Sequence, residues 1–244
     1  MLKTITRCIF TLSILAIGLA SAEPKDTHPK QIKLVYDVIR NGQPFATVTE
    51  SYTQSDNQYH IVSITKGLGV YALFGERKLT SDGTVSAEGL KPVHFELRQG
   101  DNAKKWLATD FDWVNNTLNM TIKGHVNAVP LIAGTQDLAS FPYQFIYLSL
   151  DKKLVEKKEP TDIALNVTTG KKVQVYTYKA IVPDAPLEVA AGSFKTIELS
   201  SAKETNDESK QIWLASDKHF LPVRIITRDE KGVIEQSLKS LQFD

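Results

Sequence analysis

The segment IWLASDKHFLPVRII, residues 212–226, holds the closest grouping of side chains that could do chemistry. Asp217 and His219 can act as general acid and base if a nucleophile accompanies them. The chain contains no G-x-S-x-G, H-E-x-x-H or Walker-type motif and no G-x-G-x-x-G loop after a strand. We therefore interpret 216–219 as a polar corner between two strands. The second strand is expected to begin at Pro222 or to lie at a sheet edge, because proline lacks a backbone donor.

Other residue types used in catalysis and metal binding are scattered. Asp110 and Asp112 share one face of an expected strand, because residues i and i+2 point the same way, and we expect that face to meet solvent. The histidines have no second ligand at metal-binding spacing. The sequence therefore predicts a protein that is not an enzyme and holds no metal or cofactor. The histidines are His28, His60, His94, His125 and His219.

Most of the chain alternates with a period of two, which indicates strands. Asn41-Gly42 between the first two runs is a strong hairpin signal, and Asp82-Gly83 and Asn115-Asn116 are among the later expected turns. The pattern predicts a mainly β fold: a single antiparallel curved sheet forming an open or closed barrel, with one or two short helices packed inside or across it. The expected strands are 32–40, 45–53, 59–65, 78–86, 91–98, 105–113, 116–123, 162–168, 173–182, 187–190, 194–200, 211–215, 220–228 and 233–243.

Two segments break the alternation. Residues 67–75, GLGVYALFG, are apolar on all sides and fit either a short buried helix or a strand. In 134–150, Ser140 can cap a helix and Pro142 suits its first turn. Phe141, Phe145 and Leu148 recur at helical spacing. We expect a helix from about 141 to 151, with its aromatic face buried against the sheet.

The first residues have the features of a secretory signal peptide. Lys3 and Arg7 precede an apolar run from Cys8 to Ala20, and the small residues Ala20-Ser21-Ala22 follow. The run is too short to span a bilayer, so we expect cleavage after Ala22, a periplasmic location and no membrane span afterwards. Cleavage would remove the only cysteine.

Residues 23–244 are expected to form one domain. They carry 27 Lys and Arg against 28 Asp and Glu, since residues 1–22 hold Lys3 and Arg7 and no acid. A balanced charge argues against nucleic acid as a partner, because phosphate binding draws on clustered cations. The polar stretch 151–161 is interpreted as a surface connection within that domain.

Several short motifs in order resemble a bacterial envelope family catalogued as domain of unknown function 3108. The last hairpin is also similar to the end of periplasmic lipoprotein carriers of the LolA/LolB type, and that similarity implies a half-open barrel with an apolar lining and a helical plug. The envelope family carries no established activity, so it implies no catalytic residue. The motifs are YDV at 36–38, TSDGTV at 80–85, GLKPV at 89–93, DFDW at 110–113, QDLASFPYQ at 136–144, AGSFKTI at 191–197 and WLASDKHFLPVRI at 213–225.

Two functions follow as hypotheses. The first is binding of a lipid-like or other hydrophobic ligand in the concave face of the curved sheet. The second is an envelope assembly or scaffold role through contacts with another envelope protein. The oligomeric state is left open. The residues expected to line a ligand cleft are Val70, Tyr71, Phe74, Phe141, Phe145, Tyr147 and Trp213.

Overall fold

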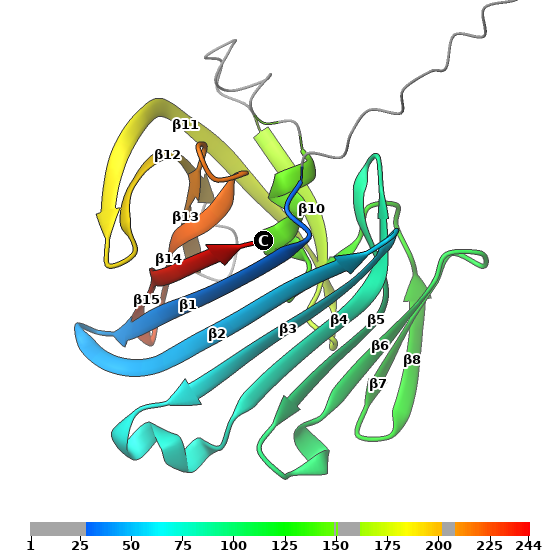
Figure 1. Ribbon diagram of the computed structural model, residues 1–244. Coiled ribbons are helices and arrows are strands. Elements are labelled where there is room, and N and C mark those ends of the chain that lie inside the picture. Colours follow the sequence, from blue (N-terminus) through cyan, green and yellow to red (C-terminus); the bar gives the residue numbers. More distant parts are fainter. Residues whose placement is uncertain (1–27, 149, 151–161, 202–207) are drawn as a thin grey trace, which may run out of the picture.

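A single curved sheet dominates the computed structural model (Figure 1), which describes residues 28–148, 150, 162–201 and 208–244. The described residues form fifteen strands, and the mainly β prediction is confirmed. The expected signal peptide, 1–22, and the polar connection, 151–161, lie outside the described residues.

The first half of the sheet follows chain order, each strand pairing antiparallel with the next. Seven expected strands are confirmed to within a few residues, but the short strand β8 was not predicted because it lacks a buried face. The strands are β1 (Gln31–Arg40), β2 (Gln43–Ser55), β3 (Gln58–Gly67), β4 (Arg77–Ser86), β5 (Gly89–Gln99), β6 (Leu107–Asp112), β7 (Thr117–Ile122) and β8 (His125–Pro130).

The second half also follows chain order, except that β9 and β10 pair in parallel. The expected strands 173–182 and 187–190 are one long strand, β11, with an irregular register near its middle. The strands are β9 (Gln136–Asp137), β10 (Asp162–Thr168), β11 (Val173–Val189), β12 (Gly192–Ser201), β13 (Ser209–Ala215), β14 (Leu221–Asp229) and β15 (Gly232–Phe243).

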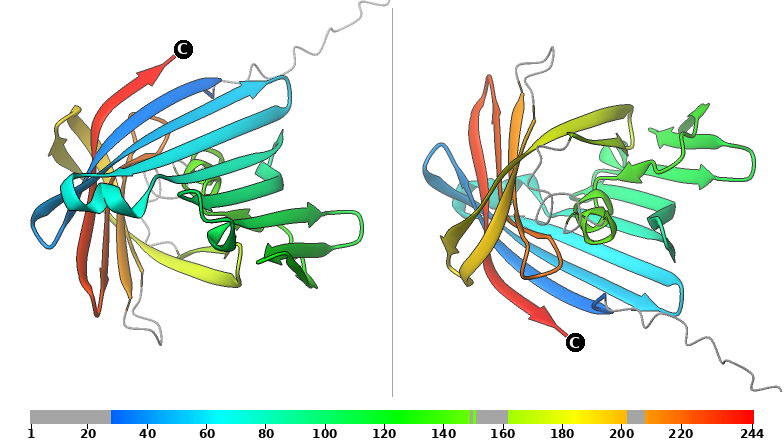
Figure 2. Two further views of the ribbon diagram at one scale, coloured as in Figure 1. Left: turned by 90° about the horizontal axis from the view of Figure 1, so that it is seen from below. Right: turned by 90° about the horizontal axis from the view of Figure 1, so that it is seen from above.

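The strand order forces the sheet to curl. β1 pairs with β15, so the first and last strands meet at the centre, and β8 and β9 form opposite edges. A flat sheet of fifteen strands would be roughly 65 Å wide at about 4.8 Å per strand. Residues 131–135 join β8 to β9 and reach only about 20 Å. The edges must therefore approach each other, and the three views show a strongly bent, open sheet (Figures 1 and 2).

A short helical plug lies inside this bend. It consists of helix α1 (Phe141–Gln144) and the 3-10 turn η3 (Phe145–Tyr147), and it lies between the two halves of the sheet in all views (Figure 2). The helix expected to reach about 151 is thus shorter: it tightens to a 3-10 turn at Phe145, and Leu148 follows its end. The expected aromatic face is confirmed, because Phe141 and Phe145 are buried and Leu148 packs against the same cluster.

Ser140 holds the N-cap position of α1, as expected, but the carboxylate of Asp137, and not the Ser140 hydroxyl, accepts the backbone N–H groups that precede the helix. Asp137 Oδ1 accepts the backbone N–H groups of Ala139 and Ser140, both at 2.8 Å. Ser140 Oγ in turn accepts the N–H of Asp137 at 2.9 Å. Ser140 itself has helical backbone angles and makes no side-chain cap. The D-x-x-S spacing supports this reciprocal arrangement, which resembles a capping box.

Segment 67–75 is neither a strand nor a buried helix. β3 ends at Gly67, and Gly69–Phe74 form the 3-10 helix η1, which has no buried residue. Its apolar side chains lie at the surface because the helix stands at the β3–β4 corner, beyond the end of the plug. Another short 3-10 helix, η2 (Ala103–Lys105), connects β5 to β6.

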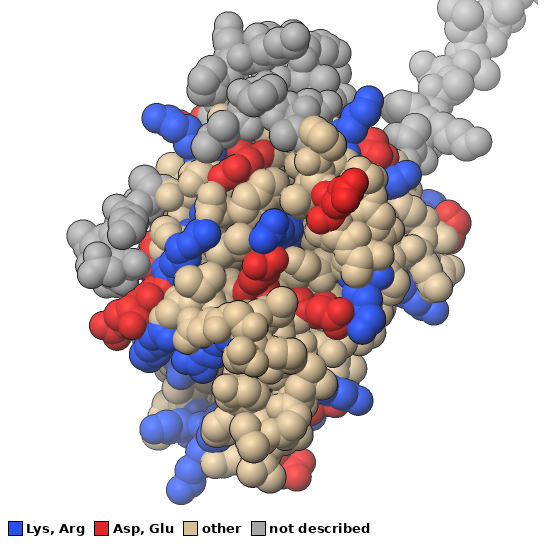
Figure 3. All heavy atoms as spheres, turned by 90° about the vertical axis from the view of Figure 1, so that its left-hand side faces the viewer, with Lys and Arg blue, Asp and Glu red and all other residues tan. Residues whose placement is uncertain are grey.

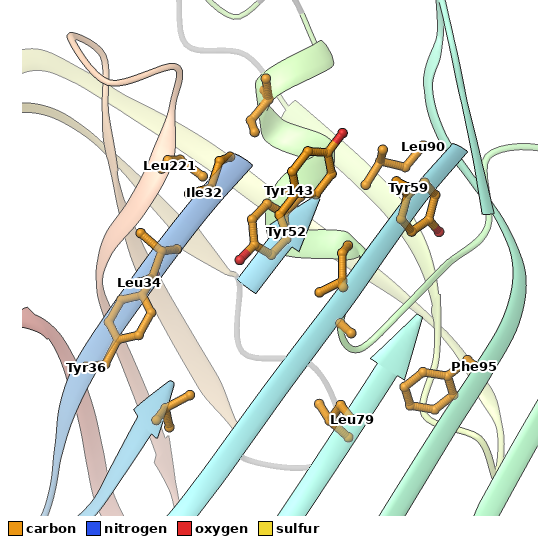
Figure 4. Close-up of a cluster of buried hydrophobic side chains, with 14 of the residues drawn as sticks. Ile32, Leu34, Tyr36, Tyr52, Tyr59, Leu79, Leu90, Phe95, Tyr143 and Leu221 are labelled. Carbon is orange, nitrogen blue, oxygen red and sulfur yellow. The ribbon is translucent and has the colours of Figure 1, made fainter. Parts of the chain in front are cut away.

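The interior is filled by side chains that point from the strands toward the plug (Figure 4). The larger of two clusters joins β1–β7 to β12, β14, β15 and the plug residues Tyr143 and Ile146. The smaller cluster joins β10–β14 to the plug residues Phe141 and Phe145. The plug therefore presents one face to each cluster, and buried apolar area is the main force that fixes it.

Three of the expected turns, at Asn41-Gly42, Asn115-Asn116 and 216–219, are confirmed, and the one at Asp82-Gly83 is wrong. Asn41 and Gly42 have φ of 49° and 78°, as a tight hairpin requires, and 216–219 form the predicted corner. Asp82-Gly83 lies inside β4, at a register shift opposite Pro92. Pro222 lies at the start of β14, but that strand lies between β13 and β15 and is not an edge.

Candidate ligand site in the concave face

The inward faces of β4–β7 continue past the end of the plug. Along β5, Phe95 is fully buried, Leu97 is half-buried and Gln99 follows on the same face. Along β7, Leu118 and Met120 are buried and Ile122 is half-buried. Burial thus falls toward one end of the strands, because the plug covers only part of the concave face.

The uncovered part encloses a cavity of about 570 Å³. Its apolar surface comes from Leu97, Leu107, Ile122 and Leu138. Leu107, which is buried, and Ile122, which is half-buried, face inward beyond the two core clusters. This volume falls within the roughly 300–1,000 Å³ typical of small-molecule sites. The lining residues are Arg77, Leu97, Gln99, Lys104, Lys105, Leu107, Ile122, Lys123, Leu138, Thr169 and Lys171.

Two segments from the other half of the chain close one side of the cavity. Leu138 comes from the turn that begins the plug, and Thr169 and Lys171 come from the β10–β11 turn. Gly170 in this turn has φ of 81°, and a side chain there would meet Leu107 at 3.2 Å. Glycine therefore allows the turn to lie directly on β6.

The described side chains that line the cavity carry charge of one sign. Arg77 projects from the inward face of β4 and four lysines stand in the lining, but among the residues that the structure describes no Asp or Glu does. Elsewhere the charges are mixed, and the face in Figure 3 carries acidic and basic side chains side by side. The positive lining is thus a local feature of a chain whose total charge is close to zero. The lysines are Lys104, Lys105, Lys123 and Lys171.

A buried carboxyl group lies beside the plug, away from solvent. Asp137 is fully buried, and its Oδ2 accepts the hydroxyl of Ser81 at 2.6 Å. Ser81 Oγ also lies 3.1 Å from the hydroxyl of Tyr59. Burial raises the pKa of Asp137 to about 6, although the hydrogen bonds from Ser81 and the plug oppose that rise. Since its oxygens are occupied by structural bonds, we assign Asp137 a positioning role for the plug.

A second carboxyl group links the plug to the first half of the sheet. Glu50 on β2 accepts the hydroxyl of Ser63 at 3.1 Å and that of Tyr143 at 3.3 Å. Burial raises the pKa of Glu50, and these two bonds oppose the rise. The Tyr143 ring also stacks on Tyr52, with 5.3 Å between centroids. These contacts hold the plug in one orientation.

The structure places the seven residues expected in a ligand cleft in separate locations. Val70 and Phe74 on η1 are 73% and 67% exposed, and the Tyr71 ring packs at a tilt against Phe45, with 4.6 Å between centroids. Phe141 and Phe145 are buried in the smaller cluster. The assignment of these residues to a cleft stays a prediction, and none of them lines the cavity described above.

The remaining two expected residues are half-buried. The Tyr147 hydroxyl lies 3.0 Å from that of Tyr52, at the end of the plug. Trp213 lies under the guanidinium of Arg224, 5.4 Å from the ring centroid, and Arg224 also pairs with Glu235 at 2.8 Å. Trp213 thus belongs to a strand-to-strand contact within β13–β15.

The scattered polar candidates pair with neighbouring strands. His94 Nδ1 lies 2.6 Å from Asp110 Oδ1, while Asp112 accepts backbone N–H groups of the β6–β7 turn. Asp217 and His219 lie at the 216–219 corner, with both side chains exposed. Within the described ranges, no three His, Cys, Asp or Glu side chains gather as a metal ion would need.

Sequence reasoning missed the cavity residues. One signal was available for Arg77, because alternation places it on the same strand face as the core residue Leu79. The lysines gave no such signal, since they lie in turns far apart in sequence.

None of the helices in the described ranges has the length and apolar character needed to cross a bilayer.

Comparison with solved structures supports the fold. A β-barrel-like protein of domain of unknown function DUF1849 from Brucella abortus aligns with a TM-score of 0.55 at 10% identity, covering 88% of this chain and 98% of that one. A protein with a YmcC-like fold from Bacteroides fragilis covers 88% of this chain and 96% of its own at 10% identity, but its TM-score of 0.36 supports no inference.

Comparison by sequence identifies the family. A search of curated proteins finds no match. Residues 34–239, which include every strand that surrounds the plug, match the family described as Protein of unknown function (DUF3108). The chain therefore belongs to the DUF3108 family.

Proposed function

We propose that this chain is an exported, periplasmic protein without catalytic activity that binds a lipid-like ligand in the concave face of its sheet. The observation that carries the proposal is the cavity of about 570 Å³ beyond the plug. Its floor is formed by inward-facing Leu107 and Ile122, which lie outside the two core clusters. Export is supported by the N-terminal sequence, with its charged start, apolar run and small-residue site.

Burial of an aliphatic chain would supply the binding energy. Each methylene group removed from water contributes about 0.8 kcal/mol, so a chain of several carbons over this floor gives measurable affinity. The plug supports the role in a second way. Since Phe141 and Phe145 pack in the smaller core cluster, the plug is held without a ligand, and we expect the open part of the concave face to keep its shape.

The test is to fill the cavity with protein. We expect delipidated protein to bind the neutral fluorescent probe N-phenyl-1-naphthylamine and I122W to lose at least about tenfold in affinity, because the indole occupies the floor. V114W serves as the control, since Val114 is 89% exposed in the β6–β7 turn, and should bind like the parent. Fluorescence titration measures both.

Protein purified from an exporting host is also expected to carry lipid that organic solvent extracts and mass spectrometry detects. Absence of both co-purified lipid and probe binding would overturn the proposal. The scaffold alternative would then be favoured by β8, a strand that among the described residues pairs only with β7 and is exposed along most of its length.

A further inference from the structure

We propose that the ligand of this cavity is an amphiphilic anion: an aliphatic chain that ends in a carboxylate, phosphate or sulfate group. The inference rests on the proposed function and specifies its ligand. The chain would lie on Leu97, Leu107 and Ile122. The head group would meet Arg77 and the lysines at the opening of the cavity.

Arg77 is the strongest argument for the head group. It is half-buried on the inward face of β4, and no ion pair or hydrogen bond engages its side chain among the described residues. Two other arginines of the sheet have acidic partners: Arg98 lies 2.7 Å from Glu96, and Arg224 lies 2.8 Å from Glu235. A half-buried cation without a partner is costly, and a bound anion would offset that cost. A guanidinium can also donate two parallel hydrogen bonds to a carboxylate or phosphate.

The lysines add charge from separate parts of the chain. Lys104 and Lys105 lie in η2, Lys123 follows β7 and Lys171 lies in the β10–β11 turn. All four are exposed, so their flexible side chains can reach a head group of variable position. Together with Arg77 they place five positive charges around one opening, and the described part of the chain adds no acidic residue to the lining. Such a site attracts anions and repels cations.

The apolar floor distinguishes an amphiphile from other anions. A free phosphate or small carboxylate would leave the half-buried Leu97 and Ile122 in contact with water. Single-stranded nucleic acid is bound by stacking its bases on aromatic side chains, and none of the described residues that line the cavity is aromatic. An aliphatic chain with one anionic end matches both parts of the cavity.

The experiment compares ligands that differ only in charge or only in chain. Laurate, dodecyl phosphate, neutral methyl laurate and inorganic phosphate are titrated into delipidated protein below any micelle-forming concentration. We expect laurate and dodecyl phosphate to bind at least about tenfold more tightly than methyl laurate. Inorganic phosphate should bind weakly. Added salt should lower the affinity for the two anionic amphiphiles but not the affinity for methyl laurate.

Variants assign the head-group contacts. R77Q should lose about tenfold or more in affinity for laurate and retain its affinity for N-phenyl-1-naphthylamine. K104Q/K105Q changes only exposed residues and should also weaken laurate binding, which keeps the test open if R77Q fails to fold. R98Q is the matched control, because Arg98 lies on the next strand but pairs with Glu96 on the opposite face.

The outcomes separate the two proposals. Binding of the neutral probe and methyl laurate as tight as that of laurate, unchanged in R77Q and K104Q/K105Q, would overturn the anionic head group and leave the proposed function standing. Failure of every amphiphile and of the probe would overturn the proposed function itself. Inorganic phosphate binding as tightly as dodecyl phosphate would reveal a simple anion site and also overturn the inference.

Discussion

Single residues in the interior of this protein work mainly by holding the plug. Asp137 lies at the junction of β9 and the plug, where one carboxyl oxygen accepts two backbone N–H groups and the other accepts Ser81. This arrangement begins a short helix that could not be stable alone. Its cost is a carboxyl group kept away from water, which raises the pKa of Asp137 to about 6.

That raised pKa predicts a pH dependence of stability. The unfolded chain releases the Asp137 proton near pH 4, whereas the folded chain holds it to about pH 6. The stabilisation is therefore fully present below about pH 4 and is lost as the pH rises to about 6, by roughly 3 kcal/mol. In D137N the amide oxygen can still accept both N–H groups. We expect urea unfolding to show a smaller loss of stability from pH 4 to pH 7 in D137N than in the parent.

The comparison between the two proteins cancels the titration of all other groups. D137A provides a second reference, because it removes the hydrogen-bond acceptor as well as the charge. We expect it to be less stable than D137N by about 1–3 kcal/mol at both pH values. Parallel pH profiles for the parent and D137N would contradict the prediction.

Among the elements, the plug and the first half of the sheet are joined by side-chain amides. Gln144 Oε1 accepts the N–H of Leu90 at 2.8 Å, and its Nε2 donates to the carbonyl of Glu88 at 2.9 Å. Gln136 Nε2 donates to the carbonyl of Leu90, also at 2.8 Å. These amides satisfy backbone groups at the start of β5, as a neighbouring strand would.

Removing the Gln144 side-chain amide should lower the stability of the protein. Q144A leaves the buried N–H of Leu90 without its acceptor, so we expect a loss of about 1–3 kcal/mol in the free energy of unfolding. Q43A, an exposed position on β2, should change it by less than about 0.5 kcal/mol. Urea denaturation followed by circular dichroism measures both, and equal midpoints for the two variants would refute the role of Gln144.

For the whole molecule, the larger core cluster spans both ends of the chain. It joins Tyr36 on β1 and Phe95 on β5 to Val223 on β14 and Leu238 on β15. The Tyr36 hydroxyl also donates to the carbonyl of Pro222 at 2.8 Å. Because these contacts cross between the halves, we expect residues 23–244 to unfold as one unit.

The tryptophans can test this. Trp106 and Trp113 flank β6 in the first half, and Trp213 lies on β13 in the second. W213F reports only the first half, and the double variant W106F/W113F reports only the second. In each variant the fluorescence and circular dichroism midpoints in urea should coincide. A fluorescence midpoint of Trp213 that departs from the circular dichroism midpoint would indicate two separately unfolding parts.

Much of this architecture was predictable, because strand alternation and turn residues are local signals. The Asn41-Gly42 hairpin and the 216–219 corner follow from the conformations that those residues favour. The plug was predicted from Phe141, Phe145 and Pro142, although its length and the role of the Asp137 carboxylate were not. β8 and β9 were missed because one lacks a buried face and the other has two residues.

The sequence by itself determined the strands, the main turns and the aromatic face of the plug, since each depends on residues a few positions apart. Only the tertiary structure decided that β1 pairs with β15 and that the sheet bends to let β9 reach β10. That bend brings Lys104, Lys123 and Lys171 to the same cavity as Arg77. Strand pairing is a contact between distant parts of the chain. Local periodicity therefore cannot predict which cationic side chains will lie close together in the folded protein.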